Sequence, residues 1–175
     1  RMTYMSKLVA PHGGKGLVCC KLEGAELEAE LKKAEGLKKI EISSQVKGDL
    51  IMLGIGGFSP LNGFMTKADW KGVCEDFLLA DGTFWPVPVM LDAAADAAAD
   101  INVGDEITLE KDGEIYATMK IEEKFEMTED DKKWECEKVY KGHGEESEDD
   151  VFWKIAMEDH PGVQMVMARK EFCLA

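Results

Sequence analysis

The feature that most constrains the fold of this chain is the dipeptide Asp112-Gly113, which lies between two short runs of strand-forming residues. This dipeptide is a strong signal for a tight β-hairpin, because it accepts the positive φ angles that such turns need. Residues 107–110 and 115–121 are therefore predicted to be the paired strands of a hairpin.

Helical patterns precede and follow this hairpin. Leu27 and Leu31 are spaced i, i+4 within the stretch 24–35, which Gly36 can cap. The clearest helix begins at Thr66, with a Thr-x-x-Asp start related to the capping box. Its apolar stripe consists of Trp70, Val73, Cys74 and Phe77. Further helices are predicted after Ser43, over 93–99, from Thr128 to about Tyr140, after Ser147 over 151–157 and, as a single turn, over 163–168.

Three other segments are predicted to be extended, namely 37–42, 84–91 and 172–175. Within 84–91, Pro86 and Pro88 stand two residues apart, so both missing N–H groups face one edge, and such a strand belongs at a sheet edge or barrel rim. Residues 1–22 are expected to form an irregular arm. Because helices and strands follow one another without steady alternation, the fold class is α+β, with a small barrel-like mixed sheet wrapped by short helices.

The length and charge of the chain exclude several classes of partner. Its 175 residues suit one domain with a sizeable core. Lys and Arg number 21 against 35 Asp and Glu, a net charge of −14, which disfavours nucleic acid and anionic membrane surfaces. No stretch approaches the ~20 apolar residues of a membrane span. Residues 1–10 lack the apolar run of a signal peptide, so a cytoplasmic location is expected.

The residue types that usually carry chemistry are present but not in a suggestive arrangement. The five cysteines are expected to be reduced thiols, since none forms a C-x-x-C pair. His12 is expected to make a hydrogen bond that holds the fold, while His143 lies in a polar segment and His160 at a helix end. The glycines around 13–16 and 54–57 fail the phosphate-loop patterns and are expected to permit close backbone approach. The cysteines are Cys19, Cys20, Cys74, Cys136 and Cys173.

The acidic runs 129–131 and 145–150 are expected to be solvated, because they lack the ligand alternation and central glycine of a calcium loop. Aromatic residues are expected in the core, because no basic residues interleave with them. No catalytic, cofactor-binding or metal-binding residue is therefore predicted in this chain. The aromatic residues in question are Trp70, Phe77, Trp85, Trp134 and Trp153.

Two further segments carry specific expectations. Phe58, Leu61 and Phe64 make the loop 56–64 too apolar for a free loop tip, so it is expected to be buried. The segment 144–159 is expected to expose its acidic first half and to dock its apolar second half.

Several ordered motifs resemble those of one enzyme family. Residues 11–14 read P-H-G-G, 56–64 read G-G-F-S-P-L-N-G-F, and 80–89 read A-D-G-T-F-W-P-V-P-V. Two shorter blocks, E-K-V-Y-K-G at 137–142 and H-P-G-V at 160–163, follow in the same order. The chain thereby resembles ATP sulfurylase, also called sulfate adenylyltransferase, and is most similar to the enzymes of sulfate-reducing bacteria. The segment between the last two blocks, residues 144–159, is longer than the corresponding segment in many members of that family.

The resemblance covers only the N-terminal, PUA-like domain of that family. It implies an arm at 1–22, a PUA-like domain at 23–170 and, at 171–175, the start of a linker to an absent catalytic domain. The catalytic signatures Q-x-R-N-P-x-H and H-x-x-H do not occur here. The resemblance implies that the whole enzyme makes adenylyl sulfate and pyrophosphate from MgATP and sulfate, binds both outside this chain, and forms a homo-oligomer. The chain alone is expected to be inactive.

Two other functions are compatible with the residues. PUA-like domains elsewhere bind RNA, so the chain could be a stand-alone binding module, although its negative charge weighs against RNA. It could also be an oligomerisation module without a ligand. The mass of the intact source protein separates the enzyme from both alternatives.

Overall fold

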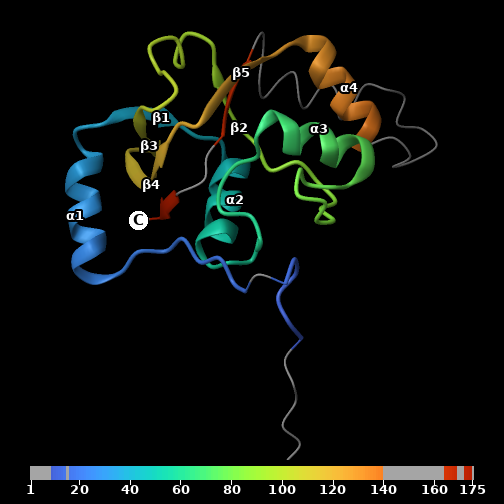
Figure 1. Cartoon of the computed structure of the whole chain (residues 1–175). Coiled ribbons are helices and arrows are strands. Elements are labelled where there is room, and N and C mark those ends of the chain that lie inside the picture. Colours follow the sequence, from blue (N-terminus) through green and yellow to red (C-terminus); the bar gives the residue numbers. More distant parts are fainter. Residues whose placement is uncertain (1–8, 15, 140–163, 169–171, 175) are drawn as a thin grey trace, which may run out of the picture.

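The structure is a computed structural model that describes residues 9–14, 16–139, 164–168 and 172–174 (Figure 1). Four helices and seven strands are assigned within these residues. The helices are α1 (Gly24–Ala34), α2 (Ser44–Gly54), α3 (Lys67–Asp76) and α4 (Glu129–Val139). The strands are β1 (Lys38–Glu41), β2 (Leu91–Ala94), β3 (Glu106–Lys111), β4 (Glu114–Lys120), β5 (Glu123–Met127), β6 (Gln164–Ala168) and β7 (Phe172–Leu174).

The larger sheet has the strand order β1-β3-β4-β7. Strand β1 runs parallel to β3, while the β3–β4 and β4–β7 pairs are antiparallel, so the sheet is mixed. Asp112 and Gly113 connect β3 to β4 with φ angles of 52° and 81°. These positive values confirm the predicted hairpin and its turn.

The smaller sheet has the strand order β2-β6-β5 and is antiparallel throughout. Only Ile121 and Glu122 separate β4 from β5, so the chain passes directly from one sheet to the other. The α+β class and the mixed sheet are confirmed. Figure 1 shows α1 and α2 on either side of the larger sheet, and α3 and α4 together beside the smaller one.

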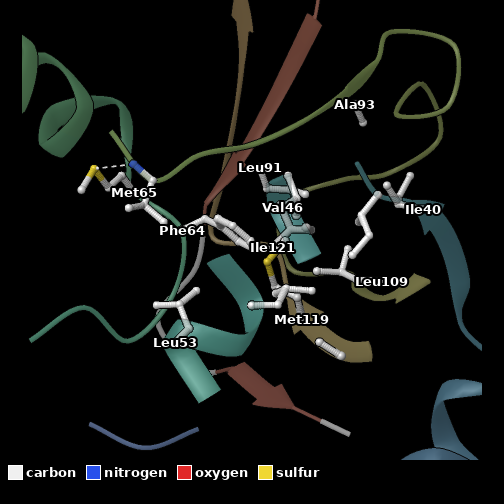
Figure 2. Close-up of a cluster of buried hydrophobic side chains, with 14 of the residues drawn as sticks. Ile40, Val46, Leu53, Phe64, Met65, Leu91, Ala93, Leu109, Met119 and Ile121 are labelled. Carbon is white, nitrogen blue, oxygen red and sulfur yellow. Dashed lines mark hydrogen bonds between the residues drawn. The ribbon is translucent and has the colours of Figure 1, made fainter. Parts of the chain in front are cut away.

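The two faces of the β3–β4 hairpin explain this arrangement. Thr108 and Thr118 are cross-strand partners and both face α1: the Thr108 hydroxyl donates to the carbonyl of Ala34 at 2.8 Å, and that of Thr118 donates to Glu30 at 2.6 Å. Because side chains alternate along a strand, Ile107, Leu109, Ala117 and Met119 face the opposite side. There they form the main core with residues of α2 and of loop 56–64 (Figure 2).

The helix starts follow the predicted caps. The hydroxyl of Ser43 accepts from the backbone N–H of Val46 at 3.1 Å, and Thr66 accepts from Asp69 at 3.2 Å. Thr128 likewise accepts from Asp131 at 3.1 Å. Each cap satisfies a backbone donor that the first helical turn leaves free. None of the helices in the described part of the chain is long and apolar enough to cross a membrane.

Several segments differ from the sequence-based predictions. Residues 84–90 are not a strand: the ladder begins at Leu91, because Pro86 and Pro88 cannot donate to it. Backbone N–H groups nearby bond locally instead, Trp85 to the carbonyl of Phe77 at 2.7 Å and Val89 to the sulfur of Met65 at 3.4 Å. The prediction of an edge strand over 84–91 is therefore wrong, and the edge strand of the smaller sheet, β2, shares only Leu91 with it.

Two predicted helices are strands or turns. The stretch 93–99 is not a helix, because its first residues belong to β2 and turns follow. The helical turn predicted over 163–168 is also wrong, since Gln164–Ala168 is β6, which pairs with both β2 and β5. In both segments pairing with distant strands overrides local propensity.

Other expectations have mixed outcomes. Strand β7 confirms the extended prediction at the end of the chain, and β1 confirms the one at 37–42. Strand β5 was not predicted. Phe77 does not continue the apolar stripe of α3: it adopts the left-handed conformation that ends the helix and is 45% exposed. The helix predicted over 151–157 and the segment 144–159 lie outside the described residues.

Candidate functional site

Three motif segments that are far apart in sequence meet at one junction. These are the arm at 11–14, the loop at 56–64 and the aromatic pair Phe84-Trp85. The His12 ring nitrogen Nε2 lies 2.6 Å from the carbonyl oxygen of Phe84, and because a carbonyl only accepts, the ring nitrogen donates. The His12 ring also stands edge-on to the Phe84 ring, with centroids 6.4 Å apart. This confirms the structural role predicted for His12.

Ser59 connects the arm to the loop. Its hydroxyl accepts from the backbone N–H of Val18 at 2.9 Å and donates to the carbonyl of Gly56 at 2.7 Å. Ser59 and Gly56 are buried and Val18 is half-buried, so water has little access to this pair of bonds. The hydroxyl therefore fixes how the arm crosses the loop.

Glycines let the arm approach the loop closely. Gly56 has a φ of 78°, and a Cβ atom there would lie 2.9 Å from the sulfur of Cys19. A Cβ atom on Gly13 would lie 2.9 Å from the ring of Pro60. Beyond Cys19, the backbone N–H groups of Cys20 and Lys21 both donate to the carbonyl of Gly54. Gly13 and Gly56 thus have the close-approach role that the sequence predicts, whereas Gly14 and Gly16 have open space at their Cβ positions.

Aromatic packing completes the junction. Phe58 and Trp85 meet edge to face with centroids 5.7 Å apart, and Trp85 is buried. The buried loop is confirmed at Leu61 and Phe64, whereas Phe58 is only half-buried, so its removal costs less than that of a core phenylalanine. The Trp85 indole N–H has no acceptor among the described residues. The bonds of His12 and Ser59 together hold the arm against the loop.

A partly buried carboxyl group joins α3 to α4. The indole N–H of Trp70, which is fully buried, donates to Glu135 at 3.0 Å, and the Trp70 ring meets Trp134 edge to face at 5.2 Å. Burial raises the pKa of Glu135 to about 7, and the charge of Asp92 adds to the rise. Sequence reasoning missed Glu135, because nothing local marks a helical glutamate as buried.

The thiols near this carboxyl group are not activated. Burial raises the pKa of Cys74 to about 12, with smaller contributions from Glu135 and Glu75, and burial also raises the pKa of Cys136. A thiol is nucleophilic as its thiolate, so neither group suits nucleophilic chemistry. Cys19 is also a free thiol, and it is exposed.

The described residues contain no group of three or more His, Cys, Asp or Glu side chains placed to hold a metal ion. In the acidic run 129–131, Asp131 bonds to Thr128 and thereby caps α4. His143, His160 and the run 145–150 lie outside the described residues, as does the side chain of Cys173. The expectation that this chain carries no catalytic, cofactor or metal residue stays a prediction.

The chain is similar to several curated proteins that are named sulfate adenylyltransferases. The chain is similar to the sulfate adenylyltransferase of Desulfatibacillum aliphaticivorans, with 71% identity over 98% of this chain and 41% of the relative. It is 68% identical to that of Desulfovibrio desulfuricans over 98% of this chain and 40% of the relative. The chain therefore spans about two fifths of the length of the curated relatives that it matches.

A solved structure and a family model describe the fold. The structure, described as a hexameric APS kinase from Thiobacillus denitrificans, aligns with a TM-score of 0.67 and 26% identity over 97% of this chain and 27% of that chain. The family model is described as a PUA-like domain and matches residues 9–175. Since that match includes nearly every residue, this chain belongs to the PUA-like domain family.

Proposed function

We propose that this chain is the N-terminal PUA-like domain of a sulfate adenylyltransferase. The observation that carries the proposal is the 71% identity to one such enzyme over 98% of this chain. The whole enzyme would convert MgATP and sulfate to adenylyl sulfate and pyrophosphate, in sulfate activation or sulfate reduction.

In this proposal the chemistry belongs to the part of the enzyme outside this chain. Adenylyl transfer needs positioned cations that bind the triphosphate and stabilise charge at the α-phosphoryl group. The chain has a net charge of −14, which opposes the binding of sulfate and ATP. Its described residues pack into a core, cap helices or join the arm to the loop. The domain would therefore support the catalytic domain, in a homo-oligomer located in the cytoplasm, while MgATP and sulfate bind elsewhere.

The test is a full-length chimera in which this chain replaces the matching 41% of its 71% identical relative. Pyrophosphate-dependent ATP synthesis from adenylyl sulfate is measured for the chimera and for the relative. We expect comparable turnover, because this chain would support the catalytic domain as the relative's own N-terminal domain does. A folded chimera without activity, beside an active relative, would contradict it.

The 175-residue chain by itself provides the complementary assay. It should give no turnover above a mock purification, because the cationic groups that adenylyl transfer requires would lie in the remainder of the enzyme. Activity that persists after the removal of full-length enzyme would place the chemistry in this chain instead.

A further inference from the structure

A short hairpin follows α3 and presents apolar side chains outward. Leu78 and Phe84 form an isolated antiparallel bridge. The backbone bonds flank this pair: Trp85 donates to Phe77 at 2.7 Å, and Leu79 donates to Thr83 at 2.8 Å. Leu78 and Phe84 are thus a non-hydrogen-bonded pair, whose side chains lie close together on one face of the hairpin.

This face is exposed, whereas neighbouring residues are buried. Phe84 is 54% exposed and Leu78 is 39% exposed, and Phe77 and Val87 beside them in the chain are each 45% exposed. Leu79, by contrast, is buried in the main core. We call the paired side chains of Leu78 and Phe84 the apolar hairpin face.

The hairpin is held in place from several directions. The backbone N–H of Leu78 donates to Gly72 in α3, and that of Ala80 donates to the Asp69 carboxylate at 2.8 Å. Gly72 is required for this contact, because a Cβ atom there would lie 2.5 Å from the carbonyl oxygen of Leu78. On the other side, His12 bonds to the carbonyl of Phe84. A fixed aromatic side chain loses little conformational freedom on binding, which is the property of an interface anchor.

We propose that the apolar hairpin face is the contact through which this domain docks on the remainder of the longer enzyme. This inference rests on the proposed function. Length indicates what covers this face, because the chain spans only 41% and 40% of the two relatives named above and 27% of the hexameric neighbour. A second copy of this domain suits the face poorly, because each copy carries a charge of −14 and the copies repel one another.

The first experiment is hydroxyl-radical footprinting of the full-length chimera described above. Phe64, which is 2% exposed, provides the buried reference, and Val103, which is 61% exposed and lies outside the hairpin, provides the exposed one. Docking predicts that Phe84 and Leu78 are labelled several-fold less than their exposure in the domain would allow, and that they react like Phe64. Labelling of Phe84 at the level expected for a half-exposed ring would overturn the proposal.

The second experiment identifies the occupant. A photoreactive benzoylphenylalanine replaces Phe84 in the same chimera, and a matched variant carries it at Val103. Cross-links from position 84 to residues outside this chain, within one polypeptide, support the proposal. Cross-links to residues of this chain would overturn it. Cross-links to a second copy that disappear on dilution would overturn it as well.

The activity of the chimera separates this inference from the proposed function. An active chimera with a fully labelled Phe84 would refute the docking contact and leave the enzyme assignment standing. A chimera that is inactive but protected at Phe84 would refute the assignment of activity. Substitution of Phe84→Ser in the chimera should restore labelling of Leu78, whereas Val103→Ser should leave Leu78 protected.

Discussion

At the scale of single residues, the side chains that hold this domain together have partners far away in sequence. Ser59 bonds to Val18, which is 41 residues earlier, and His12 bonds to Phe84, which is 72 residues later. The sequence predicts that His12 makes a structural bond, because a histidine between proline and glycines is poorly placed for chemistry. It cannot name the acceptor, which is a backbone carbonyl with no signature of its own.

The Ser59 hydroxyl provides the sharpest test of the junction. Ser59→Ala removes the acceptor of the Val18 N–H, while the carbonyl of Gly56 keeps the backbone N–H of Ser59, and a typical hydrogen bond contributes about 0.5–1.5 kcal/mol. The free energy of unfolding, measured in urea, should fall by that amount. The matched control Ser44→Ala, at an exposed position in the first turn of α2, should change it by less than about 0.5 kcal/mol. Equal effects of the two variants would refute the structural role of Ser59.

Glu135 makes the stability of the domain depend on pH. Its pKa is raised from 4.5 to about 7, so between these values the folded state binds a proton that the unfolded state has lost. This bound proton stabilises the folded state fully below pH 4.5. The stabilisation, on the order of 3 kcal/mol, is lost as the pH rises through 7. Asp49, whose pKa burial raises to about 6, acts in the same direction.

The variant Glu135→Gln isolates this contribution. The amide oxygen of glutamine can still accept from Trp70, and it carries no charge to desolvate. Unfolding free energies measured from pH 5 to pH 8 should therefore decline less in the variant, which should be more stable than the parent at pH 8. The exposed neighbour Glu137→Gln serves as the control and should leave the slope unchanged. If Glu135→Gln left the pH dependence of the unfolding free energy unchanged, the titration of Glu135 would not be its cause.

At the scale of elements, locally encoded features are predictable and long-range pairing is not. Caps such as Ser43 and Thr66 and the turn at Asp112-Gly113 act within a few residues, so the sequence shows them directly. Strands β2, β5 and β6 depend on pairing between residues more than 30 positions apart, as at Met127 and Gln164. Local patterns there favour helices, which is why 93–99 and 163–168 are predicted wrongly. The strand predicted over 84–91 fails for another reason, because Pro86 and Pro88 cannot donate to a ladder.

The β3–β4 turn can be tested with two glycine substitutions of opposite sign. Gly113 has a φ of 81° and open space around its Cβ position, so Gly113→Ala adds only backbone strain, about 1 kcal/mol or more. Gly48 lies in α2 with open space at its Cβ position, so Gly48→Ala should stabilise the domain by roughly 0.5–1 kcal/mol. Thermal unfolding of both variants provides the measurement. A stabilising effect of Gly113→Ala would show that the turn does not have this conformation.

At the scale of the whole molecule, the motifs that resemble one enzyme family also meet in space. Segments 11–14, 56–64 and 84–85 form the junction at which the arm crosses the domain. The resemblance to that family rests on these motifs, but the sequence alone cannot say that they touch. It also cannot reveal the apolar hairpin face, because exposure of Phe84 depends on how Leu79 and Trp85 pack beneath it.

We propose that this domain is part of a longer enzyme, and the mass of the intact source polypeptide provides a direct test. An antibody against the 175-residue chain would capture that polypeptide for intact mass spectrometry. The chain weighs 19.4 kDa and covers 41% of its 71% identical relative, so dividing the one by the other predicts a subunit of about 47 kDa. A natural polypeptide of about 19.4 kDa, with no larger form, would contradict the account.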